Sequence, residues 1–209
     1  VGTPPATIDT PKLLSGFKGK YFQAEGSSVQ FWSPVTGTRT ENAIYPRSEL
    51  RETYADGRLR NWTYPEADNY LRATLAINQV PFSGKIVIGQ IHAYDSQKPL
   101  VKVEYQYKEK TQTGNIVAKV RMRPDDSKGR VIIVAENVPL QRNFTYVIHL
   151  NKAGLLSIEA ANGQWNERLG AAWGKKPLYF KAGVYVQDNS GDSKEGGKVT
   201  FAKLDIDHN

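Results

Sequence analysis

Side chains that can neutralise charge or move protons recur at every second position in three short segments of the chain. The clearest segment, residues 179–187, reads Tyr-Phe-Lys-Ala-Gly-Val-Tyr-Val-Gln. Because side chains alternate between the two faces of a β-strand, one face of this segment carries Tyr179, Lys181, Gly183, Tyr185 and Gln187. Two phenols, an ammonium and an amide in one row suit a hydroxylated or anionic ligand. The same alternation is also typical of an ordinary strand with a solvated polar face.

The other two segments show comparable rows of polar residues. Residues 45–52 read Tyr-Pro-Arg-Ser-Glu-Leu-Arg-Glu, which places Arg47, Glu49 and Arg51 on one strand face. This row is either a surface ladder of salt bridges or a binding site in which a carboxylate holds two arginines. Residues 86–94 begin apolar and turn polar along one predicted face, which carries Ile86, Ile88, Gln90, His92 and Tyr94. Taken alone, the histidine fits a structural or surface role better than catalysis.

Together, the three segments resemble the signature blocks of a known enzyme family. Arg-Ser-Glu-Leu-Arg at 47–51, Gln-Ile-His at 90–92 and the nine residues at 179–187 are similar to the blocks of the polysaccharide lyase family 7 alginate lyases, in the family's order and across about two thirds of the chain. The resemblance implies a β-jelly-roll whose concave sheet forms a groove for an anionic polymer of mannuronate and guluronate. Many relatives carry Asn where this chain has Val186. Because Val186 faces away from Tyr185, this difference should affect packing more than chemistry.

The residues in these blocks are of the types needed for β-elimination from a 4-linked uronate. The C5 proton becomes acidic only when the neighbouring carboxylate is neutralised, which Arg47 and Gln90 can achieve by donating hydrogen bonds to the developing enolate. His92 can act as the base when neutral, as its ordinary pKa of about 6.5 allows. Tyr185 can protonate the departing O4 oxygen, and for mannuronate Tyr185 could serve as both base and acid. The resemblance implies the same roles for these four residues.

Four further polar residues are predicted to contact the substrate. Lys181 and Arg51 are expected to bind neighbouring carboxylates, and Gln187 to hydrogen-bond the sugar or orient Tyr185. Glu49 is expected to hold the two arginines of its own segment rather than to take part in the chemistry. For each of them, a solvated strand face is the alternative interpretation.

The resemblance also bears on specificity. In this family, Ile at the middle of the Gln-Ile-His block is associated with guluronate or mixed blocks, and Val with mannuronate. Ile91 therefore implies a guluronate or mixed-block preference, and we expect endo cleavage within the polymer. Gly183 is expected to leave room for a sugar beside Tyr185.

The elements that must position these residues read as strands. Short runs of β-branched and aromatic residues alternate with Gly, Pro, Asn and Asp, and no long helical pattern is present. The predicted strands are 29–33, 47–52, 70–77, 86–94, 100–107, 116–123, 131–134, 144–150, 155–160, 179–187 and 199–206. This pattern predicts an all-β protein, a jelly-roll sandwich of two antiparallel sheets with a concave groove.

The predicted organisation is a single catalytic domain, residues 1–209, with an extended lead-in at residues 1–11 that contains three prolines. Residues 12–16 could form one helical turn at most. The polar stretches 188–198 and 51–64 are candidate mobile loops beside the site.

Composition narrows the partners. The net charge of +7 is dispersed among strand-like segments, which favours a basic cleft for an anionic polysaccharide over a nucleic-acid-binding tail. No apolar run reaches the roughly 20 residues that span a bilayer, so no membrane partner is expected. We expect a monomer, and the class of substrate implies a secreted or periplasmic location.

Other chemistries find less support. The chain contains no cysteine, and its three histidines are widely spaced, so neither a metal site nor a cofactor is expected. No close acidic pair marks a glycoside hydrolase. The remaining alternative is a non-catalytic jelly-roll module that binds anionic carbohydrate. Such a module needs donors and aromatic rings, but it does not need a matched base and acid like His92 and Tyr185.

Overall fold

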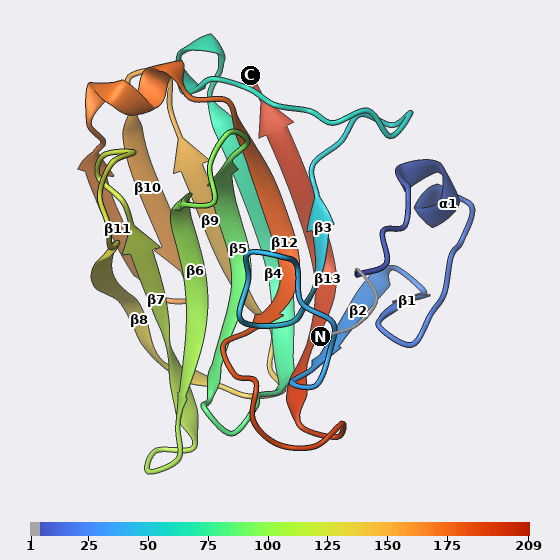
Figure 1. Cartoon of the computed structure of the whole chain (residues 1–209). Coiled ribbons are helices and arrows are strands. Elements are labelled where there is room, and N and C mark those ends of the chain that lie inside the picture. The colour runs from blue at the N-terminus through green and yellow to red at the C-terminus, as the bar shows by residue number, and fades with distance from the viewer. Residues whose placement is uncertain (1–4) are drawn as a thin grey trace.

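The computed structural model describes residues 5–209, and in that part of the chain thirteen strands form two antiparallel sheets packed face to face (Figure 1). Three short helical segments accompany them. In chain order the elements are α1 (Thr10–Leu14), β1 (Phe22–Glu25), β2 (Ser28–Pro34), β3 (Arg47–Arg51), the 3₁₀ turn η1 (Tyr64–Glu66), β4 (Asn69–Gln79), β5 (Lys85–Ala93), β6 (Pro99–Lys108), β7 (Thr113–Val120), β8 (Arg130–Pro139), β9 (Phe144–Leu150), β10 (Leu155–Ala160), β11 (Gly163–Arg168), the 3₁₀ turn η2 (Ala171–Lys175), β12 (Leu178–Val186) and β13 (Gly196–His208).

The strand order brings distant parts of the chain together. One sheet has the order β1-β2-β13-β4-β9-β10-β11, and the other has the order β3-β12-β5-β6-β7-β8. The last strand therefore lies between the second and fourth strands, and β12 lies between β3 and β5. This arrangement confirms the predicted all-β jelly roll of two antiparallel sheets.

The core lies between the sheets and follows the alternation of each strand. On β12, Phe180, Ala182, Val184 and Val186 are buried in the core. Val186 therefore packs inward, as its position in the alternating pattern indicates. The intervening residues of β12 are left on the outer face of the six-stranded sheet, where the polar row was predicted.

Strand β5 departs from simple alternation. Val87 pairs with Glu104 and Gly89 with Val103, so two steps along β5 match one step along β6, which is a β-bulge. The bulge lies where the Tyr146 hydroxyl donates to the Ile88 carbonyl at 2.9 Å. A Cβ on Gly89 would lie 2.6 Å from that hydroxyl oxygen, so the close approach requires glycine.

The bulge changes which residues of β5 share a face. Ile86 and Ile88 belong to the core, whereas the Gln90 and His92 side chains lie among the polar groups of the outer face. The expected single face from Ile86 to His92 is therefore wrong, because the bulge reverses the alternation between Ile88 and Gln90.

The two edge strands of the seven-stranded sheet were not predicted from the sequence. Strands β1 and β11 lie at its two ends, and their residues alternate only between partly buried and exposed. At the amino-terminal end, α1 begins at Thr10, because Asp9 caps it by accepting from the Lys12 amide at 2.9 Å. The expected extended lead-in therefore ends before residue 10, and residues 1–4 lie outside the described part.

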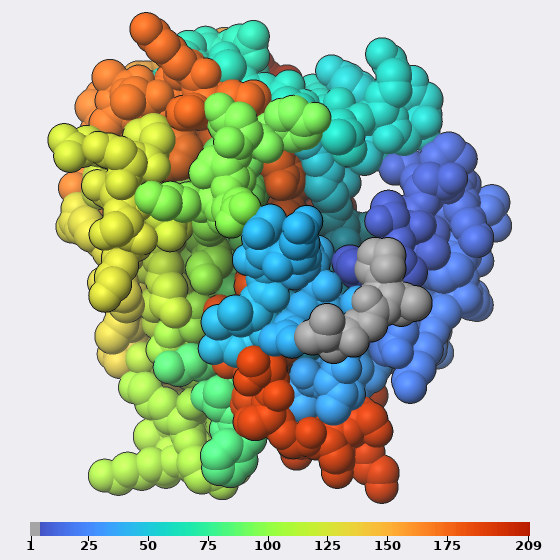
Figure 2. Space-filling model, viewed as in Figure 1, coloured from blue at the N-terminus to red at the C-terminus, as the bar shows by residue number. Residues whose placement is uncertain are grey.

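The outer face of the six-stranded sheet is hollowed and partly covered. Figure 2 shows the segment between β2 and β3, residues 35–46, in front of this face. The Asn189 side chain donates to the Ile44 carbonyl at 3.3 Å, which links this segment to the loop after β12. Residues 35–46 were not among the predicted loops beside the site. Within residues 5–209, no helix is long and apolar enough to cross a membrane.

Candidate active site

Three neighbouring strands bring all eight predicted site residues together. Register pairs Arg47 with Tyr185 across β3 and β12, and Arg51 with Lys181 in the same pair of strands. Lys181 in turn pairs with Gln90, and Tyr179 with His92, across β12 and β5. Glu49 lies between the two arginines, and Gln187 directly follows β12. The three sequence segments therefore form one polar surface.

Glu49 is the centre of this surface. Its side chain is only 3% exposed and accepts from Gln90 Nε2 at 2.5 Å and from Lys181 Nζ at 2.6 Å, while Arg47 Nη1 lies 3.4 Å away. Burial alone would raise the pKa of Glu49, but the positive charges of Lys181 and Arg47, together with these hydrogen bonds, hold it below its ordinary value. Glu49 is thus an ionised carboxylate that fixes three donors.

Gln90 is oriented by this contact. Its side-chain nitrogen faces Glu49, and the residue is 1% exposed. A primary amide nitrogen carries two hydrogens, so the contact with Glu49 leaves one of them for another acceptor. The contact with Glu49 therefore presents Gln90 to a ligand as a donor.

His92 is held in the form of a base. Its Nδ1 lies 2.9 Å from the Ala93 carbonyl oxygen, which can only accept, so Nδ1 carries the proton and Nε2 keeps its lone pair. Burial lowers the pKa of His92, and the nearby charges of Lys181 and Arg47 lower it further. The imidazole also stacks on Tyr179, with ring centroids 5.5 Å apart.

Tyr185 is suited to donate a proton. Burial raises the pKa of its phenol, although Arg47 and a hydrogen bond from Gln187 partly oppose that rise. The Arg47 guanidinium carbon lies 3.7 Å from the centroid of the Tyr185 ring. The phenol therefore stays protonated beside the guanidinium that is proposed to bind the carboxylate.

Glu49 was expected to hold both Arg47 and Arg51, but its partners within residues 5–209 are Arg47, Gln90 and Lys181. Arg51 has other partners. Its guanidinium donates to the carbonyls of Glu52 and Arg60 and to the Asn61 side chain, and it stacks on Tyr179 at 3.9 Å from the ring centroid. These contacts join β3 to the segment that follows it. Arg51 has less capacity left for a substrate carboxylate than Arg47 has.

Gly183 does not leave room for a sugar. Its φ angle is 147°, and an added Cβ would lie 2.4 Å from the Ser48 carbonyl oxygen and 3.3 Å from the Phe31 ring. The missing side chain allows β12 to approach β3 and the core instead. The expectation was wrong because the backbone at Gly183 turns its empty side toward protein.

The site continues onto β6 and β7, which the three sequence segments did not predict. Gln90 pairs with Lys102, and Lys102 pairs with Lys119, so a cross-strand row extends beyond the three blocks. Glu104 lies on the same face of β6 and pairs with Lys119 at 2.8 Å. The signal was present in the alternation of residues 100–107, where charged residues interrupt apolar ones. Among residues 5–209, no group of three histidine or acidic residues is placed to hold a metal ion.

Known alginate lyases are similar to this chain over nearly its whole length. A family model described as alginate lyase matches residues 1–208. An alginate lyase of Klebsiella pneumoniae is 24% identical over 255 residues, covering 96% of this chain and 82% of the relative. The crystal structure of an alginate lyase from Pseudomonas aeruginosa is 42% identical, with a TM-score of 0.95 over 100% of this chain and 95% of the other.

A further solved structure carries the family number. Alginate lyase A1-II', described as a member of polysaccharide lyase family 7, is 27% identical, with a TM-score of 0.81 over 96% of this chain and 88% of the other. A substituted form of that enzyme has been solved in complex with a substrate, GGMG. With a family match over nearly its whole length, this chain belongs to the alginate lyases of polysaccharide lyase family 7.

Proposed function

We propose that the polar surface of β3, β12 and β5 cleaves the 1,4-glycosidic bonds of alginate by β-elimination. The observation that carries this proposal is that one site contains both a neutral imidazole, His92, and a protonated phenol, Tyr185. Beside them lie two donors, Arg47 and Gln90, which contact the buried carboxylate of Glu49. A site that only bound the polymer would not need a matched base and acid.

The first requirement is to stabilise the enolate. The Arg47 guanidinium and the free N–H of Gln90 donate to the carboxylate of the reacting uronate, which lowers the cost of the second negative charge that develops as the C5 proton leaves. Glu49 supports this step indirectly, because it holds the Gln90 amide and neighbours Arg47.

The second requirement is proton transfer. His92 Nε2 takes the C5 proton, the C4–O4 bond breaks, and a double bond forms between C4 and C5. Tyr185 gives its proton to the departing O4 oxygen, so one product carries an unsaturated sugar at its end. For mannuronate, whose C5 proton lies on the side of the leaving group, the ionised form of Tyr185 takes the C5 proton and then gives the same proton to O4. This route therefore starts from the phenolate, the minor form of a residue whose pKa is raised.

The proposal also covers the preferred substrate and the location of the enzyme. The complex of A1-II' with GGMG supports a polysaccharide substrate for the corresponding surface of this chain. Ile91 supports a guluronate or mixed-block preference, although its side chain is buried in the core and can act only through its neighbours. Endo cleavage is part of the same proposal and does not rest on Ile91. We also propose that the enzyme acts as a monomer. Its substrate class supports a location in the periplasm or outside the cell.

The test is direct. Incubation with alginate, without added metal, should produce ultraviolet absorbance from unsaturated ends, and His92→Asn or Tyr185→Phe should lower turnover of guluronate-containing substrate by about 10²–10⁴-fold. Lys203→Gln, on an exposed residue of β13 in the other sheet, is the matched control and should keep wild-type rates. Tight binding of alginate without any absorbance would instead support the non-catalytic module.

A further inference from the structure

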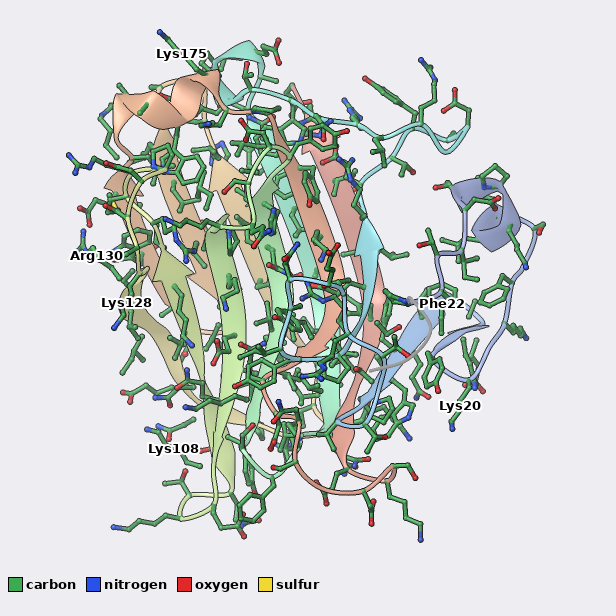
Figure 3. All side chains as sticks on the ribbon, in the orientation of Figure 1. Lys20, Phe22, Lys108, Lys128, Arg130 and Lys175 are labelled. Carbon is green, nitrogen blue, oxygen red and sulfur yellow. The ribbon has the colours of Figure 1, made fainter. Side chains whose placement is uncertain are left out.

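Lys102 is a half-buried cation that the proposed chemistry does not use. It lies on β6, one strand beyond Gln90, and its ammonium nitrogen is 6.0 Å from the centroid of the Tyr185 ring. The residue is only partly exposed. In this it differs from Lys108, Lys128, Arg130 and Lys175, whose side chains extend outward at the periphery of the molecule (Figure 3).

Within residues 5–209, the ammonium group of Lys102 makes no hydrogen bond and no ion pair. The nearest carboxylate on the same strand, Glu104, is already paired with Lys119 at 2.8 Å and accepts from Gln106 at 3.0 Å. Lys119 is therefore neutralised, and Lys102 is not.

The electrostatic surroundings are unfavourable for a cation. Burial lowers the pKa of Lys102. The charge of Glu104 opposes that fall, whereas the charges of Lys119, Arg121 and Arg47, each with a smaller effect than Glu104, lower the pKa further. A partly desolvated charge without a counter-ion destabilises the folded state. An anion that entered the groove beside Tyr185 would remove this penalty, so the arrangement favours an anionic ligand at this point.

We propose that Lys102 binds the carboxylate of the uronate adjacent to the one held by Arg47 and Gln90. The inference rests on the proposed function and adds a subsite to it. Neighbouring strands lie about 4.8 Å apart, so the row from Lys181 through Gln90 to Lys102 spans two such steps across the sheet. A polyuronate carries one carboxylate on every sugar, and the row ends at Lys102 because Lys119 already has its partner.

The experiment compares Lys102→Gln, Lys102→Arg and the control Lys203→Gln on oligouronates of increasing length. We expect Lys102→Gln to lower kcat/KM by about tenfold, mainly through KM, on every oligouronate that is long enough to place a uronate in this subsite. Lys102→Arg should restore most of the loss because it keeps the charge. The thermal midpoint of Lys102→Gln should be unchanged or raised, since an unpaired charge has been removed.

Two outcomes would overturn the inference. Equal kcat/KM for wild type and Lys102→Gln at every oligouronate length would show that Lys102 does not form a subsite. A loss confined to kcat, with a shift of the alkaline limb of the pH profile, would mean that Lys102 acts on Tyr185 instead of on the substrate.

Binding without turnover separates this inference from the proposed function. Calorimetric titration of the same oligouronates into Tyr185→Phe and into Tyr185→Phe/Lys102→Gln should show weaker binding by the double variant. If that difference appeared while the wild type produced no unsaturated ends, the subsite would stand and the lyase proposal would fall. If the wild type cleaved alginate but the two variants bound equally, the subsite alone would fall.

Discussion

Two carboxylates three residues apart, Glu49 and Glu52, are both buried but lie in very different networks. Glu49 faces the groove and contacts Arg47, Gln90 and Lys181. Glu52 faces the interior, where it accepts from Trp62 Nε1 at 2.8 Å and from the Phe180 amide at 2.9 Å. Both side chains are almost fully shielded from solvent, so burial alone does not distinguish a site residue from a structural one.

The difference lies in what their partners have left to offer. Glu52 also contacts His208 Nε2 at 2.8 Å, and His208 Nδ1 lies 2.7 Å from the Asn69 side-chain oxygen. The donors on Trp62, Phe180 and His208 are therefore all satisfied inside the protein. This network joins β13, β12 and the 52–62 segment. The partners of Glu49 are a guanidinium, an amide and an ammonium, which carry more N–H groups than one carboxylate can accept. The surplus donors are what a substrate carboxylate can use.

The largest expected effect that tests this comparison is on stability. Glu52→Gln should lower the free energy of unfolding by about 3–5 kcal/mol, because it removes one partner of a buried ionic network. For a chain of this length the thermal midpoint should fall by about 10 °C. Calorimetry or circular dichroism would measure it, and kcat/KM of the folded fraction should stay within about threefold of wild type at low temperature. A stable Glu52→Gln enzyme with low activity would contradict the structural assignment.

Glu49→Gln should show the converse behaviour. The substitution leaves Lys181 without its counter-ion and no longer fixes the orientation of the Gln90 amide, so kcat/KM on alginate should fall by about 10–100-fold, in line with the loss of a preorganised donor. Steady-state rates from ultraviolet absorbance would measure the fall. Glu49→Ala is a second variant that removes the acceptor completely, and its kcat/KM should fall at least as far. Unchanged kinetics in both variants would mean that Glu49 only stabilises the sheet.

The pH profile should move by a smaller amount and in a defined direction. Because the pKa of His92 is lowered, the base stays neutral below its ordinary pKa of about 6.5, and the acid limb of kcat/KM should lie below that pH. The charge of Glu49 raises the pKa of His92, so Glu49→Gln should move the acid limb to still lower pH. The raised pKa of Tyr185 places the alkaline limb above about 10. An acid limb above pH 6.5 in the wild type would argue against His92 as the base.

The sequence predicted much of this arrangement, because alternation within a strand is a local property. The polar rows of β3 and β12 follow from the period of two, and the resemblance joined them to Gln90 and His92. The bulge in β5 could not be predicted in this way, since it depends on the hydroxyl of Tyr146, which reaches it from the opposite sheet across 58 positions of sequence. Strand β11 was missed because edge strands bury little apolar surface.

The contacts of individual donors were also beyond sequence reasoning. Arg47 and Arg51 stand in equivalent positions on one strand face, yet only Arg51 finds the carbonyls of the following segment. Lys102 and Lys119 stand in register, yet only Lys119 has Glu104 as its partner. Which of two like charges is left for a ligand is decided by tertiary contacts, and the alternating pattern does not contain that information.

Tyr179 gives the smallest and most specific test of how the base is held. Its ring contacts two residues. The Arg51 guanidinium carbon lies 3.9 Å from the ring centroid, and the His92 ring stacks on it with centroids 5.5 Å apart and planes inclined by 27°. Tyr179→Phe keeps the ring and should leave kcat within about twofold of wild type. Tyr179→Leu removes the stack, so the imidazole gains rotational freedom and kcat should fall by roughly three- to tenfold, the scale of a partly misplaced base. The fall should be in kcat more than in KM, since Tyr179 orients His92 and does not neutralise the carboxylate. Equal rates for the Phe and Leu variants would show that the backbone contact of His92 with Ala93 holds the base without help from the stack.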